Sequence, residues 1–195
     1  MTSTFRFRLT ILAIAVGAAL AVQSVAAAVK VRADFNKAFD FKQAHTWAWN
    51  PQGEGHVMVA RTSKDDPEAI KRLAEPYVIK AVDAEMPRHG LATATGKPDL
   101  ILTYYLLLTI GSSAQTMGQF LPATTQWGVP PFAPGTQSLE FIEQGSLVLD
   151  LSANGEAVWR GVGEAQIKTD LSTEKRAALI GEAVKKILEK YPPKQ

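Results

Sequence analysis

Residues 139–167 read LEFIEQGSLVLDLSANGEAVWRGVGEAQI, and their pattern is the strongest indication of the fold. Leucines at positions 147, 149 and 151 fall on one side of a strand expected over 139–151, because successive side chains of a strand point to opposite faces. The Asn154-Gly155 pair that follows is typical of a tight hairpin turn. Residues 157–167 alternate again, so the sequence predicts a hairpin whose second strand carries a polar face of Arg160, Glu164 and Gln166.

Residues 100–110 are expected to form the strand before this hairpin, and their side chains are mostly apolar on both faces of that strand. It is too short to span a membrane as a helix, which needs about 20 residues. Strands that are apolar on both faces are typical of sheet interiors covered from both sides. We therefore expect residues 100–110 to form a central strand.

Two further strands are expected near the start of the domain. Residues 29–35 alternate between apolar and polar side chains throughout, which indicates a half-buried strand. Residues 45–49 form a second, short strand that stops at Asn50-Pro51. Residues 52–64 contain two glycines and mixed polar residues, and we expect them to form a loop.

Two amphipathic helices complete the pattern. The first begins at Asp66, which suits an N-cap, and ends near Gly90, which suits a left-handed cap, while Pro76 is expected to kink or split it. Its expected apolar side consists of Ile70, Leu73, Tyr77, Ala81 and Ala84. The second helix covers residues 173–190, with an apolar stripe of Ala177, Ile180, Val184, Ile187, Leu188 and Tyr191. The element order is β-β-α-β-β-β-α.

Residues 1–28 are typical of a secretory signal peptide. Arg6 and Arg8 precede an apolar run at 9–22, and small residues follow before position 29. This run has 14 residues, so a cleaved signal is favoured over a permanent membrane anchor. We expect cleavage after Ala28, or alternatively after Ala26. The sequence thus predicts export and a single α/β domain at residues 29–195.

Charge and cysteine content restrict what the domain can do. The chain has 21 Lys and Arg against 19 Asp and Glu. Cleavage of residues 1–28 would remove two arginines and no acidic residue, so the expected formal charge of the mature chain is zero. A neutral domain lacks the basic surface expected of a nucleic-acid binder or of a protein held on anionic lipid. The absence of cysteine excludes disulfides, thiolate metal sites and a lipidated N-terminal cysteine. We expect a soluble protein that meets the membrane only through an uncleaved signal segment.

The long segment at residues 111–138 differs from the rest in composition. It contains four glycines, four prolines and no charged residue. Loops of this length are functional or disordered more often than structural. Its aromatic residues Phe120, Trp127 and Phe132 are candidate binding residues, unless they simply pack against the sheet.

Several segments in their order resemble the bacterial envelope family called domain of unknown function 4136. The resemblance covers nearly the whole mature chain and rests on the set as a whole. The segments that carry the resemblance are Val31-Arg32-Ala33-Asp34-Phe35, Thr46-Trp47-Ala48-Trp49, His89-Gly90-Leu91, Pro98-Asp99-Leu100, Glu143-Gln144-Gly145-Ser146-Leu147-Val148-Leu149-Asp150, Val158-Trp159-Arg160-Gly161 and Ile187-Leu188-Glu189-Lys190-Tyr191-Pro192-Pro193.

The resemblance implies an α+β fold in which a mainly antiparallel, twisted sheet packs against helices. It also implies a location in the envelope of a Gram-negative-type bacterium, and it supplies no catalytic residues. Many relatives resemble lipoproteins, but this chain has no cysteine to lipidate, so no lipid anchor is expected here.

No metal site and no cofactor are expected. His45, His56 and His89 lie on a strand start, a loop and a helix end, without the paired spacing of zinc ligands. The sequence contains neither a Gly-x-Ser-x-Gly elbow nor a phosphate-binding glycine loop. Gly111-Ser112-Ser113 is expected to form a turn rather than a nucleophile site.

Asp34, Asp150 and Glu164 are the candidate catalytic residues, because two carboxylates at a suitable separation can catalyse hydrolysis. All three lie on polar strand faces, where solvated acids are also common. Arg160 and Glu164 fit a cross-strand ion pair equally well. A hydrolase would need two of these carboxylates within about 10 Å of each other around a cleft.

Trp47 and Trp49 are further candidate binding residues, because they are two apart and share one strand face. They form either an exposed aromatic platform for a sugar or a partner strand, or a packed part of the core. Trp159 is expected to pack in the core.

Three functions are compatible with these features. The first is a non-enzymatic periplasmic domain that binds another envelope protein through residues 111–138 and the adjacent sheet edge. The second is a hydrolase of envelope or cell-wall material that uses the strand carboxylates. The third is a carrier of a small apolar ligand, which requires a cavity between sheet and helices.

Overall fold

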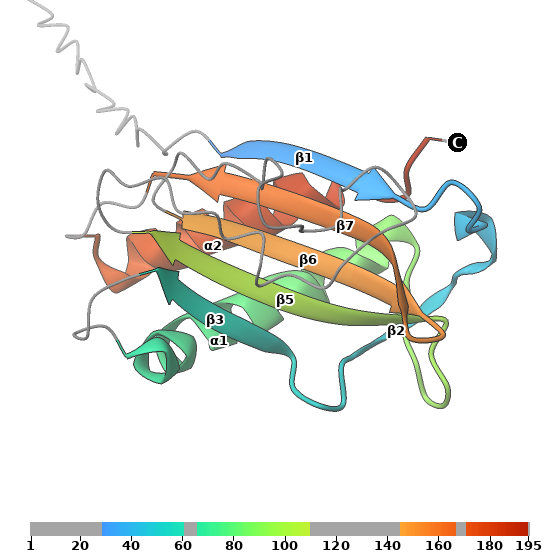
Figure 1. Ribbon diagram of the computed structural model, residues 1–195, viewed down its shortest axis with the longest axis horizontal. Helices are drawn as coiled ribbons and strands as arrows, with labels where there is room; N and C mark the ends of the chain where they lie inside the picture. Colours follow the sequence, from blue (N-terminus) through green and yellow to red (C-terminus); the bar gives the residue numbers. More distant parts are fainter. Residues whose placement is uncertain (1–28, 61–65, 110–144, 167–170, 195) are drawn as a thin grey trace, which may run out of the picture.

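In the part of the chain that the structure describes, seven strands form one sheet and two α-helices pack against it (Figure 1). This computed structural model describes residues 29–60, 66–109, 145–166 and 171–194. The helices are α1 (Pro67–Glu85) and α2 (Thr173–Leu188), with short 3-10 helices η1 (Phe41–Gln43) and η2 (Met86–His89). The strands are β1 (Lys30–Phe35), β2 (Thr46–Trp49), β3 (Gly55–Ala60), β4 (Ala92–Thr93), β5 (Leu100–Thr109), β6 (Gly145–Ala153) and β7 (Glu156–Ala165).

The strand order across the sheet is β1-β7-β6-β5-β2-β4, and β3 also lies beside β5. On one side β5 pairs antiparallel with β6, and on the other it pairs in parallel with β2 through its first half and with β3 through its second. The longest ladders, β5–β6 and β6–β7, are antiparallel. The sheet is therefore mostly antiparallel, and the predicted α+β class is confirmed.

The β6–β7 hairpin has the predicted Asn-Gly turn. Asn154 and Gly155 both adopt positive φ, at 52° and 83°, as a tight hairpin turn requires. The pairing register shifts just after Leu151, so that Leu151 faces Trp159 and Val158 is an extra, bulged residue. Residues 139–144 and 167, which the sequence also assigned to these strands, lie outside the described residues.

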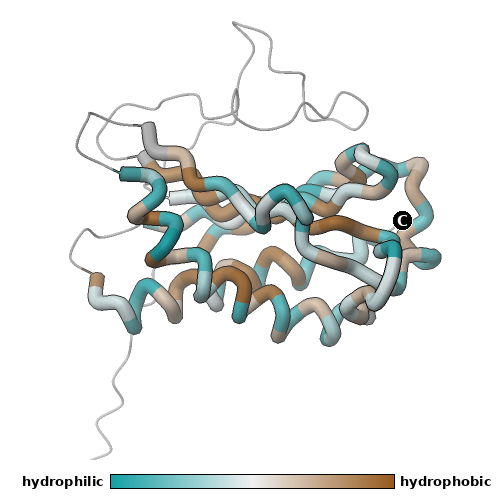
Figure 2. The backbone as a smooth tube through the Cα atoms, turned by 90° about the horizontal axis from the view of Figure 1, so that it is seen from below, coloured by the Kyte–Doolittle hydropathy of each residue, from teal (hydrophilic) through white to brown (hydrophobic). Residues whose placement is uncertain are grey.

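Both helices lie on the same face of the sheet, and Figure 2 shows the sheet and helices as two layers. The hydrophobic core fills the space between these layers. As predicted, the leucines at 147, 149 and 151 point into it, together with Trp159. From the other elements the core receives chiefly Trp47, Val78, Val82, Met86, Leu91, Leu100, Leu102, Tyr104, Val184, Ile187, Leu188 and Tyr191.

Two glycines of β7 allow α2 to approach the sheet closely. A Cβ atom at Gly161 would overlap the side chains of Ile187 and Trp159, and one at Gly163 would lie 3.0 Å from the Ile187 Cδ1 atom. Ile187 therefore rests directly on the backbone of β7. This contact explains why the core face of β7 alternates one large ring with two residues that have no side chain.

Helix α1 begins as predicted, but it ends at Glu85, and the 3-10 helix η2 covers the residues up to the predicted cap at Gly90. The Asp66 carboxylate accepts a hydrogen bond from the Glu68 amide at 3.0 Å, and Gly90 closes the following 3-10 turn with φ of 80°. Pro76 lies inside one continuous helix, so the helix is not split.

The apolar side predicted for α1 was wrong by one residue. Leu73 is 64% exposed, while the buried residues are Ala74, Val78, Val82 and Glu85, each one position beyond a predicted one. One residue corresponds to a rotation of about 100° around the helix. The helix thus turns Leu73 outward and directs its small and β-branched residues toward the core.

The loop predicted for residues 52–64 was wrong for residues 55–60, which form β3. Gly55 begins this strand directly against the ring of Tyr104, where a Cβ atom would overlap the ring. The two-residue strand β4 was also missed. The observed order is β-β-β-α-β-β-β-β-α in the described residues.

The Asp99 side chain links the start of β2 to the start of β5 through hydrogen bonds. Its Oδ2 atom accepts hydrogen bonds from the amides of His45 and Thr46, at 3.0 and 2.9 Å, and from the Thr46 hydroxyl at 2.7 Å. The Thr46 hydroxyl oxygen in turn accepts from the Asp99 amide at 3.1 Å. The hydrogen bonds from Thr46 and His45 hold the pKa of Asp99 below its usual value.

We expect Asp99→Ala to lower the urea midpoint of unfolding at pH 7. Because the pKa of Asp99 is lower in the folded chain, its stabilisation is present above the unfolded value of about 3.9 and is lost as pH falls through the folded value. The difference between parent and variant should therefore shrink below about pH 4. Urea titrations from pH 7 to pH 2 measure it, and a difference that stays constant down to pH 2 would contradict the assignment.

Two sequence predictions lie outside the described residues: the signal segment at 1–28 and the loop at 111–138. Among the helices that are described, neither is both long enough and apolar enough to cross a membrane.

Candidate functional site

The face of the sheet opposite the helices carries a buried ion pair. Arg160 of β7 donates from Nε to Asp150 Oδ1 and from an Nη atom to Asp150 Oδ2, each at 2.6 Å. Asp150 lies on β6, directly opposite Arg160 in the register. The two residues are only 5% and 1% exposed. This bidentate geometry is the strongest form of arginine–carboxylate pairing.

The ion pair belongs to a row of polar residues that crosses the sheet. Asp34 of β1 lies opposite Arg160 on the outer side, and Thr103 of β5 lies opposite Asp150 on the inner side. The Asn50 side-chain amide, just beyond β2, donates to the Thr103 hydroxyl at 3.1 Å. The row thus runs from β1 to β2 across the sheet.

Burial and charge act in opposite directions on this pair. Burial raises the pKa of Asp150, and the hydrogen bonds and charge of Arg160 counteract that rise. For Arg160 burial lowers the pKa, but the bonds to Asp150 outweigh burial and raise it. Tyr105, on the same face, has a raised pKa because of burial and then of the Asp150 charge. These directions keep Arg160 positive and Tyr105 neutral around pH 7.

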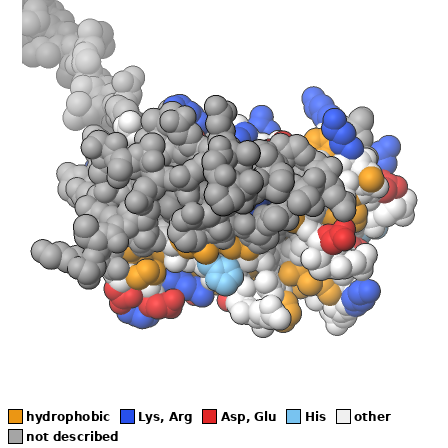
Figure 3. Space-filling view, viewed as in Figure 1, with side chains coloured by type: hydrophobic (Ala, Val, Ile, Leu, Met, Phe, Trp, Pro, Cys, Tyr) orange, Lys and Arg blue, Asp and Glu red, His pale blue; other side chains and the backbone are white. Residues whose placement is uncertain are grey.

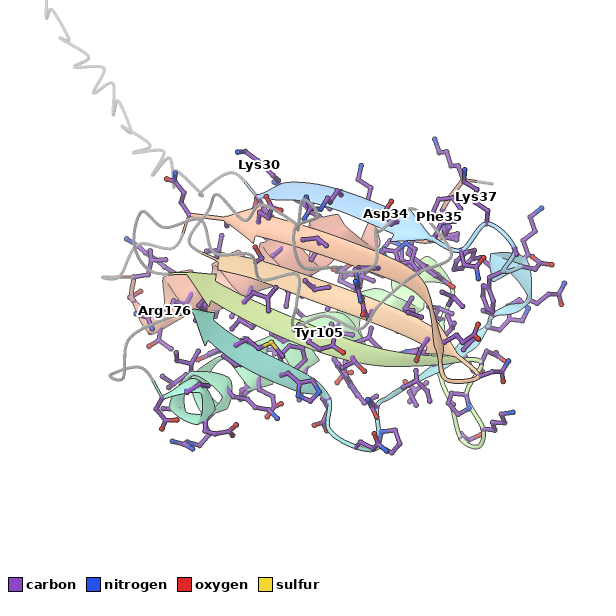
Figure 4. All side chains as sticks on the ribbon, in the orientation of Figure 1. Lys30, Asp34, Phe35, Lys37, Tyr105 and Arg176 are labelled. Atoms are coloured by element: carbon purple, nitrogen blue, oxygen red, sulfur yellow. The ribbon has the colours of Figure 1, made fainter. Side chains whose placement is uncertain are left out.

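Two further contacts flank the row. An Nη atom of Arg32 lies 3.1 Å from Oε1 of Glu164 and joins β1 to β7 a few residues away from the ion pair. The ring of His56 stacks on Tyr105, with centroids 5.4 Å apart and an interplanar angle of 25°. Figure 4 labels Tyr105 near the middle of the sheet and Asp34 near its outer edge.

The structure places all three candidate carboxylates on this face, each near an arginine. Asp34 is exposed at the edge, Glu164 pairs with Arg32, and Asp150 pairs with Arg160. Asp34 and Asp150 face Arg160 from its two neighbouring strands, so their backbones are about 10 Å apart, twice the strand spacing. In the register of the sheet, Arg160 lies between them.

One expectation about these side chains was wrong, because Asp150 is buried rather than solvated. The cross-strand ion pairing expected of Arg160 and Glu164 is observed, with Asp150 and Arg32 as the respective partners. The pairing of Asp150 with Arg160 depends on the bulge at Val158. A hairpin with a two-residue turn and no bulge would place Asp150 opposite Trp159, whereas the extra residue places it opposite Arg160. The polar residues of the two strands therefore fall on the same face.

The tryptophan pair of β2 lies against the core, on the side of the helices. Trp47 is 2% exposed and meets Trp49 edge to face, with centroids 5.4 Å apart. The Trp49 indole donates to Oδ1 of Asp83 on α1 at 3.1 Å, and its ring lies 6.5 Å from that of Tyr104. These contacts favour packing over an exposed platform. The other aromatic candidates, Phe120, Trp127 and Phe132, lie outside the described residues.

The histidines are spread over the domain. His45 and His56 are exposed, and Nδ1 of His89 lies 3.0 Å from the carbonyl oxygen of Tyr191. Within the described ranges, no group of three or more His, Asp or Glu side chains is arranged to hold a metal ion.

These features define a two-layer α+β domain in which the sheet face opposite the two described helices carries a buried arginine–aspartate pair. The chain belongs to the family described as Domain of unknown function (DUF4136), which matches residues 31–193. The resemblance found in the sequence is thereby confirmed. None of the curated proteins matches the chain.

Solved structures with a similar arrangement are only distantly related in sequence. A DUF4136 family protein from Bacteroides thetaiotaomicron is 15% identical, with a TM-score of 0.47 over 84% of this chain and 96% of that one. A PDZ domain protein from Parabacteroides distasonis is 11% identical, with a TM-score of 0.46 over 87% and 38% of the two chains. A PelC dodecamer from Paraburkholderia phytofirmans is 12% identical, with a TM-score of 0.37 over 86% and 100%.

Proposed function

We propose that this protein is an exported, non-enzymatic periplasmic domain that binds another envelope protein through residues 111–138 and the adjacent sheet edge. The observation that carries the proposal is the bidentate pairing of Asp150 with Arg160. A carboxylate held by two short charged hydrogen bonds is a poor general base, because protonation would remove the negative charge that strengthens both bonds. Glu164 is likewise engaged by Arg32. The arrangement suits a rigid scaffold better than a reaction centre.

The strands that flank residues 110–144 support a binding role for the uncharged residues 111–138 of that segment. Strand β5 ends at Thr109 and β6 begins at Gly145, and Leu108 faces Gly145 in the register of these strands. Both ends are therefore held by neighbouring strands inside the sheet. Binding residues are commonly carried on loops that a rigid scaffold positions.

Export is proposed from residues 1–28, which combine two arginines, an apolar run and small residues. N-terminal sequencing of the protein recovered from a periplasmic fraction tests it. Val29 is expected as the first residue, or Ala27 if cleavage follows Ala26. Recovery of the intact N-terminus in the cytoplasmic fraction would overturn the export proposal.

Binding is tested by replacing Phe120, Trp127 and Phe132 together with serine, and by affinity capture from envelope extract. The matched control is Leu73→Ser, which removes an exposed apolar side chain from α1. The triple variant should lose the partners that the parent and the control retain. Identical partners in all three preparations would overturn the role of this segment.

The alternative, an envelope hydrolase that uses the strand carboxylates, is tested on purified peptidoglycan and envelope polysaccharide. Release of soluble fragments by the parent protein, abolished by both Asp34→Asn and Glu164→Gln, would establish the hydrolase and overturn the non-enzymatic proposal. The third alternative, an apolar carrier, needs space between sheet and helices. The large core side chains described above occupy that region, which argues against it.

A further inference from the structure

We infer that β1 is a self-complementary edge through which two copies of this chain pair. Among the described residues β1 pairs only with β7, and it ends the strand order of the sheet. Figure 1 shows it as the outermost strand, and Figure 4 labels Lys30, Asp34 and Phe35 along it. The edge strand of a sheet presents backbone groups with which another strand can pair.

The direction of the backbone groups follows from one hydrogen bond. The Asn36 amide donates to the Val158 carbonyl at 2.8 Å, which continues the register in which Phe35 faces Trp159. In an antiparallel ladder, hydrogen-bonded and non-hydrogen-bonded positions alternate. Residues 30, 32 and 34 therefore direct their N–H and C=O groups toward β7. Residues 31, 33 and 35 direct theirs outward, away from the sheet.

A second copy of β1, antiparallel and centred on Ala33, matches these outward groups. Val31 then faces the partner's Phe35, and Ala33 faces the partner's Ala33. Three such pairs supply about six backbone hydrogen bonds. Val31, Ala33 and Phe35 are half-buried on the helix side of the sheet, so pairing also brings their apolar side chains together.

The charges of β1 select this register. Centring on Ala33 places Arg32 opposite the partner's Asp34, twice by symmetry. Centring on Arg32 would pair Lys30 with the partner's Asp34 but would oppose two arginines, and centring on Asp34 would oppose two aspartates. Opposite charges in directly facing positions stabilise a strand pair, and like charges destabilise it.

The charge pattern differs from that of a protected edge. Figure 3 shows Lys and Arg side chains along the side of the molecule where β1 lies, and the strand itself alternates Lys30, Arg32 and Asp34. Charged side chains, lysine above all, commonly protect a sheet edge from pairing with another strand, and like charges would repel a second copy. β1 instead carries both signs two residues apart, which is the spacing that antiparallel pairing needs. The pairing joins the sheets of two copies into one continuous sheet.

Sedimentation equilibrium of the purified chain tests this inference. The parent should form a concentration-dependent dimer. Asp34→Lys places lysine opposite the partner's Arg32, and Arg32→Glu places glutamate opposite the partner's Asp34. Each variant alone should dimerise more weakly than the parent, by on the order of tenfold. Mixed in equal amounts, the two should form a heterodimer, because both facing pairs are then of opposite charge.

Two controls separate edge pairing from other causes. Glu189→Lys makes the same kind of charge reversal at the exposed end of α2 and should leave the dimer unchanged. Ala33→Pro removes an outward amide without breaking the β1–β7 ladder and should abolish the dimer. Circular dichroism checks that each variant is folded. A monomeric parent, or variants that fail to associate when mixed although both are folded, would overturn the inference.

Discussion

Asp150→Ala is expected to lower the free energy of unfolding by about 3–5 kcal/mol, the usual cost of removing one partner of a buried ion pair. The reason is that the guanidinium of Arg160, which is almost fully buried, would lose the carboxylate that accepts its two 2.6 Å hydrogen bonds. Urea unfolding followed by tryptophan fluorescence measures the change.

The combined variant Asp150→Leu with Arg160→Met is the informative control. It removes both charges and keeps apolar bulk between the strands, so it should recover most of the lost stability or exceed the parent. Asp34→Ala, which removes an exposed carboxylate beside the same arginine, should have a much smaller effect. If the combined variant were as unstable as Asp150→Ala, the loss would come from packing and not from a buried, unmatched charge.

Trp159→Ala is the second substitution with a large expected effect, also about 3–5 kcal/mol. Its side chain is 0% exposed and meets the Tyr191 ring edge to face, with centroids 5.7 Å apart. Tyr191 in turn meets Phe41 at 5.8 Å, so the indole links β7 to the chain beyond α2 and to η1. Removing it leaves a large cavity beside Ile187.

Thermal unfolding by calorimetry measures this effect, with Trp159→Phe as the matched variant. Phenylalanine keeps most of the ring volume and should cost clearly less than alanine. The Trp159 indole nitrogen has no hydrogen-bond partner among the described residues, so losing it should cost little. Equal losses for phenylalanine and alanine would show that the indole shape, rather than buried volume, stabilises this region.

The sequence predicted those elements whose signals are local. The Asn154-Gly155 turn, the Asp66 cap and the alternation of β1 each depend on residues close together in the chain, and each is confirmed. The apolar side chains on both faces of β5 also correctly predicted that this strand lies inside the sheet. Local chemistry is sufficient in these cases because hairpin turns, helix caps and strand faces are set within a few residues.

What the sequence did not predict depends on distant partners. Residues 55–60 form β3 by pairing in parallel with β5, and the sequence near Gly55 does not indicate this pairing. The buried side of α1 is set by its contact with α2 and β3, not by its most apolar residues. The ion pair needed the bulge at Val158, which shifts the register by one and has no clear sequence signature. The candidate carboxylates were found, but their arginine partners were not assigned.

The contact between Gly161 and Ile187 has an evolutionary consequence. Because no Cβ fits at position 161 while isoleucine occupies position 187, the two positions cannot vary independently. In family members, alanine or a larger residue at the first position should accompany a smaller side chain at the second. Such compensating pairs would record how far α2 has moved from β7 as the lineages diverged.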